Sequence, residues 1–286
     1  MKKVELYCGA KLNLTLETLF RRSDGYHELA MVMHGIDLYD RMSLEKTDDD
    51  EIHFECSEPL PHDNTVRRAA AAFKAETGCG GVRIYLEKRI PSEAGLGGAS
   101  ADAAGTLRGM ERLYGKIDEK RLYFLGKQVG ADVPFCLHGG CALVGGIGEK
   151  LETLPSLDMS VLVVKGERGV STSALFRSLD ADALDGNRRH SLSMKEAILT
   201  GDTGAVPKLL YNDLSPAAEA LVPEITEARE KLISLGALGA CMTGSGSAVF
   251  GVFPDIESAK KAAEAFEGRF FTAACKTTER TIFAAP

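Results

Sequence analysis

The chain has 286 residues, of which 44% are hydrophobic and 26% are charged. These are the proportions of an ordinary globular protein, so disordered and fibrous classes are excluded. The formal charge is −7 and no run of Lys and Arg occurs, which argues against a nucleic-acid partner. Seven cysteines, an odd number without a Cys-x-x-Cys pair, argue against a disulfide framework or zinc site and for a cytoplasmic protein.

No membrane contact is expected. The N-terminal residues carry lysines but lack an apolar segment long enough for a signal peptide. The uncharged stretch 232–254 has Thr243-Gly244-Ser245-Gly246-Ser247 in its middle, which is unlike a membrane span. We expect the protein to act as a monomer or a weak homodimer.

Alternating apolar and polar residues predict strands in the first half of the chain. Leucines alternate with polar residues over 11–16, which predicts a half-buried strand with Lys11 and Asn13 on its polar face. The same alternation at 52–56 and 82–86 predicts two more strands.

Cap residues predict the helices that follow. One helix is expected from about Asn64 to Thr77, with Asp63 or Asn64 as N-cap and Gly78 at its end. A second begins near Ser100 after a glycine-rich turn. A third is expected over 118–129, followed by a tight connection at 130–134.

The second half is predicted to contain a strand at 159–165, a loop at 180–192, a helix opened by Pro223, a helix at 256–266 and a final strand. Strands and helices mix without regular alternation, so the fold class is α+β. We expect two domains, 1–154 and 155–286, with the final strand as a candidate to return to the first domain.

The strongest chemical signal is the glycine-rich turn from Pro91 to Ala104. Gly95, Gly97 and Gly98 let the backbone approach a ligand, and a helix follows directly. Exposed N–H groups and the helix dipole favour an anion such as phosphate there. The turn matches neither the P-loop nor the Rossmann fingerprint, and from these residues alone a purely structural turn stays open.

This turn resembles the ATP-phosphate loop of the GHMP small-molecule kinases. Further segments resemble a branch of that family that phosphorylates a cytidine-diphosphate sugar alcohol on the non-mevalonate isoprenoid route. In chain order they are Ala10-Lys11-Leu12-Asn13-Leu14, Arg22-Ser23-Asp24-Gly25-Tyr26-His27-Glu28-Leu29, Gly130-Ala131-Asp132-Val133-Pro134-Phe135, Asn212-Asp213-Leu214 and Met242-Thr243-Gly244-Ser245-Gly246-Ser247. The chain departs from the family at Ala99, where the loop usually has glycine, and at 165–172, which lacks the family's prolines.

The resemblance implies an N-terminal ribosomal-protein-S5-like ATP domain and a C-terminal ferredoxin-like α+β domain, with the site between them. It implies ATP with Mg²⁺ as phosphate donor and a cytidine-diphosphate sugar alcohol as acceptor, without dedicated metal-binding residues. Two alternatives stay open: a GHMP kinase with a different alcohol, and a non-catalytic nucleotide-binding relative.

Two residues are candidates for catalysis. On their own, Lys11 reads as a solvated strand lysine and Asp132 as a turn residue. With the resemblance, Asp132 accepts the proton of the attacking hydroxyl, and Lys11 polarises that hydroxyl and stabilises the developing charge.

The resemblance also implies the binding residues. Those for ATP are Asn64, Pro91, Ser92, Glu93, Ala94, Gly95, Leu96, Gly97, Gly98, Ala99, Ser100 and Ala101. Those for the second substrate are Asn13, Tyr26, His27, Phe176, Gly244, Ser245 and Gly246. Tyr26 would stack on the cytosine, His27 would read its edge and Phe176 would form the opposite wall. A plain N-cap for Asn64, a core position for Phe176 and a structural turn at 244–246 are the alternatives.

Overall fold

The computed structural model describes residues 2–115, 117–179, 186–266 and 268–284. Its larger sheet is built on a long antiparallel hairpin. The strands follow the order β12-β1-β2-β4-β3, with bounds β1 Lys3–Arg21, β2 His27–Lys46, β3 Ile52–Cys56, β4 Val82–Glu87 and β12 Ile282–Ala284. The last strand, β12, pairs antiparallel with the first, β1, so the end of the chain lies in the same sheet as its beginning.

Three short strands complete this sheet near the tip of the hairpin. β5 (Cys141–Gly146) pairs with β2 and with β6 (Lys150–Leu154), and β8 (Tyr211–Asn212) runs parallel to β1.

Helices cover one face of the sheet, namely α1 Thr65–Thr77, α2 Gly98–Tyr114, α3 Glu119–Val129 and α4 Val133–His138. Asn64 is the N-cap of α1, since its side chain accepts a hydrogen bond from the N–H of Arg67, and Gly78 ends the helix in a left-handed conformation. The connection predicted at 130–134 leads into α4, a helix that the sequence did not predict. Pro134 lies in its first turn, where proline is well tolerated.

The second sheet has the strand order β11-β7-β10-β9. Its strands are β7 Ser160–Lys165, β9 Gly239–Met242, β10 Val249–Phe253 and β11 Phe271–Lys276, and its helices are α8 Glu224–Ser234 and α9 Ile256–Ala263. The chain order β7-α8-β9-β10-α9-β11 is the ferredoxin-like arrangement that was expected.

The remaining elements lie between β7 and α8 in sequence: α5 Thr172–Ser178, α6 Arg189–Thr200, the 3₁₀ helix η2 Val206–Lys208 and α7 Ser215–Leu221. The prediction of a loop over 180–192 is wrong at its C-terminal end, because α6 already begins at Arg189. Residues 180–185 of that loop lie outside the described residues. In the described part of the chain, no helix is both long and apolar enough to cross a membrane.

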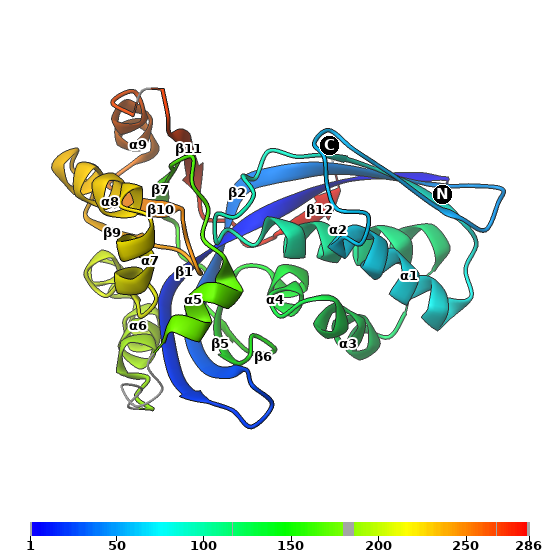
Figure 1. Ribbon diagram of the computed structural model, residues 1–286, viewed down its shortest axis with the longest axis horizontal. Helices are drawn as coiled ribbons and strands as arrows, with labels where there is room; N and C mark the ends of the chain where they lie inside the picture. Colours follow the sequence, from blue (N-terminus) through cyan, green and yellow to red (C-terminus); the bar gives the residue numbers. More distant parts are fainter. Residues whose placement is uncertain (1, 116, 180–185, 267, 285–286) are drawn as a thin grey trace.

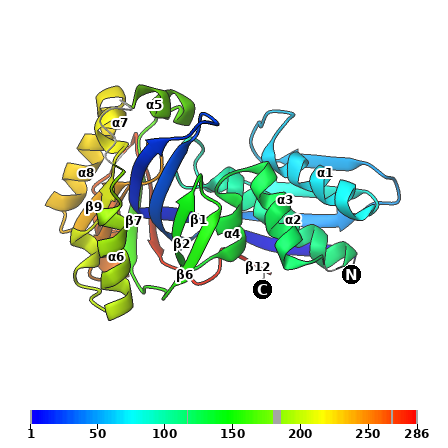
Figure 2. The same cartoon turned by 90° about the horizontal axis from the view of Figure 1, so that it is seen from below.

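Figure 1 shows the second sheet with α8 and α9 at one end of the molecule and α1 near the other, with β1 and β2 running through the middle. Figure 2 shows the tip of the β1–β2 hairpin beside α5.

The strand containing Lys11 is buried on both faces, not on one as predicted. Leu12 and Leu14 pack in one core cluster with Val161 and Phe250 of the second sheet. The opposite face lies under the glycine-rich loop, and the N–H of Lys11 donates to the Leu96 carbonyl. Because this loop covers the polar face, that face is enclosed rather than solvated.

Candidate active site

A cleft of about 870 Å³ collects most of the predicted site residues. Its walls come from β1, β2, the glycine-rich loop, the start of α4, α5 and the 244–246 turn. Every predicted site residue lines it except Tyr26, His27 and Ala101, of which Ala101 is fully buried behind the loop.

The glycine-rich loop ends at the N-terminus of α2. Gly97 is the N-cap, with φ 73°, and α2 begins at Gly98. A Cβ on Gly97 would lie 2.9 Å from Cγ of Lys11, and a Cβ on Gly95 would lie 2.0 Å from the Thr243 carbonyl oxygen. Side chains are therefore excluded at both positions by neighbouring residues as well as by backbone conformation. Ala99 lies inside α2, and its φ is not positive, so its methyl group causes no backbone strain.

Hydrogen bonds attach the loop to the second sheet. The N–H of Ser247 donates to the Glu93 carbonyl over 3.2 Å. The hydroxyl of Thr243 accepts a bond from the N–H of Asn13 (2.9 Å) and donates to the Gly95 carbonyl (3.4 Å). Thr243, which was not among the predicted site residues, thus joins β1, the loop and the start of the 244–246 turn.

The two candidate catalytic residues are neighbours. Nζ of Lys11 lies 3.6 Å from Oδ2 of Asp132 and donates to Oδ1 of Asn13 over 2.5 Å. The Lys11 side chain is only 4% exposed, whereas that of Asp132 is 31% exposed. Asp132 occupies the N-cap position of α4 without a capping hydrogen bond, so its carboxylate is available to a ligand in the cleft.

The 244–246 turn closes the cleft beside Lys11. A Cβ on Gly244 would lie 3.1 Å from Nζ of Lys11. The side chain of Asn212 donates to the Gly244 carbonyl over 2.9 Å, and the hydroxyls of Ser245 and Thr172 are 2.7 Å apart. The turn is therefore linked both to β8 and to α5.

Of the predicted aromatic residues, only Phe176 lines the cleft, and His27 packs against it. The rings of His27 and Phe176 are stacked, with centroids 5.4 Å apart and an interplanar angle of 26°. Burial and the nearby Arg21 lower the pKa of His27, so its ring is neutral around neutral pH. Tyr26 is 60% exposed and stays outside the cleft.

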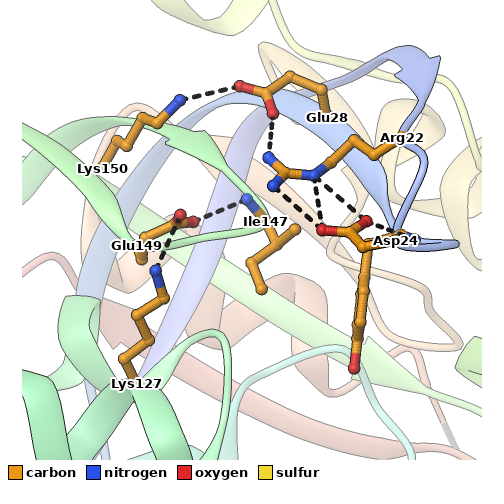
Figure 3. Close-up of polar contacts among 8 residues, drawn as sticks. Arg22, Asp24, Glu28, Lys127, Ile147, Glu149 and Lys150 are labelled. Carbon is orange, nitrogen blue, oxygen red and sulfur yellow. Dashed lines mark hydrogen bonds and ion pairs between the residues drawn. The ribbon is translucent and has the colours of Figure 1, made fainter.

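Ion pairs hold the hairpin tip that carries Tyr26 (Figure 3). Arg22 donates to Asp24 (3.1 Å) and to Glu28 (2.6 Å). Glu28 also pairs with Lys150 of β6 over 3.2 Å. Although partial burial opposes it, the hydrogen bonds from Arg22 and Lys150 lower the pKa of Glu28. The β1–β2 and β5–β6 turns are thus connected through one carboxylate.

A second carboxylate orders the β5–β6 turn itself. Glu149 accepts from the N–H of Ile147 over 2.8 Å and pairs with Lys127 of α3 over 3.2 Å. Ile147 lines the cleft, so this turn forms part of its wall.

Asn64 has two hydrogen bonds of its own in addition to lining the cleft. It caps α1, and its side-chain N–H donates to the Pro61 carbonyl over 2.9 Å. Asn64 is therefore an N-cap that also lines the cleft, and its contact with ATP stays a prediction.

Sequence reasoning missed part of the cleft wall. Apolar side chains of Leu16, Leu29, Met31 and Val170 line it, together with the charged Lys88 and Asp102. The apolar residues carry no signal that separates a cleft wall from a core. Asp102, however, lies in the stretch of α2 in which every residue from Ala101 to Leu107 is buried, and a charge among small apolar residues is such a signal. Within the described residues, no group of three or more His, Cys, Asp or Glu could hold a metal ion.

Both halves of the chain match a kinase class. The family model for the GHMP kinases N terminal domain matches residues 64–140 of the sequence. The family model for the GHMP kinases C terminal region matches residues 194–272. A homoserine kinase from Cytophaga hutchinsonii has the same fold, with a TM-score of 0.80 and 18% identity, covering 100% of this chain and 98% of that one.

Nearer relatives share one name. The 4-diphosphocytidyl-2-C-methyl-D-erythritol kinase of Alkaliphilus metalliredigens (strain QYMF) is 40% identical over 92% of each chain. That of Caldicellulosiruptor saccharolyticus is 42% identical over 89% of this chain and 90% of its own. A crystal structure of 4-(cytidine 5'-diphospho)-2C-methyl-D-erythritol kinase superposes with a TM-score of 0.79 and 35% identity, covering 96% of this chain and 99% of that one. The chain therefore belongs to the 4-diphosphocytidyl-2-C-methyl-D-erythritol kinase family within the GHMP kinases.

Proposed function

We propose that the protein transfers the γ-phosphate of ATP to the 2-hydroxyl of 4-diphosphocytidyl-2-C-methyl-D-erythritol, in non-mevalonate isoprenoid precursor synthesis. The observation that carries the proposal is the Lys11–Asp132 pair, 3.6 Å apart, in the same cleft as a glycine-rich helix N-terminus. The names of the relatives support the choice of substrate.

The pair suits phosphoryl transfer. The acceptor hydroxyl forms a bond to the γ-phosphorus while the bond from that phosphorus to the β-phosphate oxygen breaks, and ADP leaves. The hydroxyl proton passes to the carboxylate of Asp132. The ammonium of Lys11, held by the side-chain oxygen of Asn13, polarises the attacking oxygen and stabilises the charge that develops on the phosphoryl group.

ATP binds at the loop end of the cleft. Backbone N–H groups at the start of α2 face the phosphates, where the helix dipole favours negative charge. Mg²⁺ arrives as part of the MgATP substrate, and Mg²⁺ commonly keeps several of its waters. A dedicated protein cage is not required.

The cytidine end of the acceptor binds between the β1–β2 hairpin and α5. Phe176 and the exposed ring of Tyr26 offer stacking faces, and the ring nitrogens of His27 can hydrogen-bond to the base. The N–H groups of Gly244 and Ser245, next to Lys11, close over the methylerythritol, whereas the N–H of Gly246 donates to the Thr243 carbonyl.

Three broader features complete the proposal. A cytoplasmic location is supported by seven cysteines that are all free. A division at about residue 155 is supported by the change from the first sheet to the second, with β8 and β12 returning to the first. A monomer or weak homodimer stays a prediction.

A coupled ADP-release assay against 4-diphosphocytidyl-2-C-methyl-D-erythritol, mevalonate and homoserine tests the reaction. We expect turnover with the cytidyl compound alone. Turnover only with another alcohol would mean that the substrate is wrong, and ATP binding without turnover on any alcohol would mean a non-catalytic relative.

A further inference from the structure

Three charged side chains meet beneath the glycine-rich loop and have no part in the reaction described above. Lys88, which directly follows β4, forms ion pairs with Asp40 of β2 and with Asp102 of α2, the latter at 2.8 Å. The exposed fractions of these side chains are 5%, 0% and 3%. Burying charges is costly unless they are paired, and here two carboxylates share one ammonium.

The same cluster fixes both ends of the loop. Oδ1 of Asp40 accepts hydrogen bonds from the N–H groups of Arg89 (2.5 Å) and Ile90 (2.8 Å), immediately before Pro91. At the other end, Asp102 lies in α2, two residues after Ser100. The loop begins and ends on one cluster, whose centre is the ammonium of Lys88.

The loop also rests directly on this lysine. A Cβ on Gly98 would lie 3.4 Å from Nζ of Lys88 and 3.0 Å from Cγ2 of Ile90. Lys88 and Asp102 both line the cleft, so the cluster lies close to the bound phosphates. We propose that Lys88 is a positioning residue for ATP, which it serves by holding Asp40 and Asp102 together beneath the phosphate loop. The proposal rests on the ATP site of the proposed function.

The second carboxylate gives the cluster a titratable member. Oδ1 of Asp102 is buried without a hydrogen-bond partner. Burial, together with the negative charge of Asp40, raises the pKa of Asp102 to about 8, although Lys88 opposes the rise. Asp102 therefore keeps a proton more readily than an exposed aspartate does.

Lys88 and three nearby thiols do not offset the titration of Asp102. Although burial opposes it, the two carboxylates raise the pKa of Lys88, which stays charged. Burial raises the pKa of the thiols that face the cluster, Cys8 of β1, Cys56 of β3 and Cys136 of α4, so they stay neutral. As pH rises through about 8, Asp102 loses its proton, which adds one negative charge beneath the phosphates. ATP affinity should then fall.

The first test compares Lys88→Met with Lys195→Met, which removes an ammonium paired with Glu152 at the surface. Binding of ATP is measured by calorimetry, and KM for each substrate by ADP release. We expect Lys88→Met to weaken ATP binding by at least about tenfold, the scale of one charge-assisted hydrogen bond. KM for the acceptor and all constants of Lys195→Met should stay within about twofold. Unchanged ATP binding in folded Lys88→Met would overturn the proposal.

The second test remains decisive if Lys88→Met does not fold. Asp102→Asn keeps the shape of the protonated side chain and cannot ionise. ATP affinity of the wild type should fall several-fold between about pH 7.5 and about pH 9.5, where ATP itself is fully ionised, whereas that of Asp102→Asn should stay flat. The same pH dependence in both proteins would overturn the proposal. Because binding is measured directly, a protein that binds ATP in this way but fails to phosphorylate the cytidyl substrate would contradict only the proposed function.

Discussion

The two ends of the cleft are built differently. At the ATP end, the loop is attached to the second sheet by backbone hydrogen bonds, such as that from Ser247 to Glu93, and rests on the buried Lys88 cluster. At the acceptor end, the hairpin tip is held by ion pairs of partly exposed side chains, such as Arg22 with Asp24. Exposed ion pairs contribute only about 0–1 kcal/mol each, so this end is the more easily rearranged.

The aromatic rings show why rearrangement is needed. His27 and Phe176 stack on each other at 5.4 Å. A base between two rings needs roughly twice a van der Waals contact of about 3.5 Å. In the proposed binding mode, the cytosine must therefore displace His27 or use the other face of Phe176. We expect the ATP end to be preformed and the acceptor end to adjust when substrate binds.

The largest effect is expected where the two ends meet. Asp132→Asn should lower kcat by at least about 10²-fold, the scale of general-base catalysis, because the amide cannot accept the hydroxyl proton. Steady-state kinetics and calorimetry would check that both substrates still bind. A near-normal kcat in the folded variant would remove Asp132 from the reaction.

Lys11→Met should also lower kcat, by about tenfold or more, since removing one donor to a developing charge commonly costs that much. The carbon stem of Lys11 packs beneath Gly97 and is largely retained in methionine, so we expect a small change in Tm. A variant that unfolds while its folded fraction keeps full activity would instead assign Lys11 a structural role.

At the acceptor end, Tyr26→Ala should raise KM for the cytidyl substrate by roughly ten- to hundredfold, because base stacking on an aromatic ring contributes about 1–3 kcal/mol. His27→Ala should raise the same KM through the loss of its hydrogen bonds to the base. KM for ATP should change little. Phe124→Ala, an exposed aromatic residue of α3, serves as the matched control. Equal changes in KM for both substrates would show that these residues support the fold instead of reading the base.

Part of the fold could be predicted from sequence because capping residues mark helix ends, but the strands β2, β5, β6 and β8 and the helices α4 to α7 were not predicted. Asn64 and Gly78 bound α1 as predicted. The helix α4 was missed because its six residues are too short for a periodic pattern. The enclosure of Lys11 was missed because the alternation of apolar and polar residues separates the two faces of a strand. It does not show that another segment covers the polar face.

The cleft could be predicted only in part. Contiguous segments such as 91–100 carry their chemistry in local sequence, and they line the cleft together with Lys11 and Asp132. Thr243, Lys88 and Asp40 act through contacts between residues far apart in the chain, which a single sequence does not display. The stacking of His27 on Phe176, 5.4 Å apart, likewise depends on how α5 packs against the hairpin.

The smallest effect concerns Ala99, at the ATP end. Ala99→Gly should leave ATP affinity within about twofold and lower stability by about 0.5–1 kcal/mol, because Ala99 is helical and glycine is the poorer helix former. Calorimetric ATP titration and thermal unfolding would measure the two effects. A large gain in ATP affinity would show that the methyl group keeps the phosphates away from the loop.

The preformed ATP loop is tested most directly by ATP titration of Gly97→Val. Gly78→Val is the matched control, because Gly78 has a similar left-handed backbone (φ 64°) but no neighbour within 4 Å of its added Cβ. We predict that Gly97→Val loses measurable ATP binding but still binds the cytidyl substrate, while Gly78→Val, at a similar cost in backbone strain, binds ATP like the wild type. If folded Gly97→Val binds ATP normally, the phosphates bind elsewhere and the account of this loop is wrong.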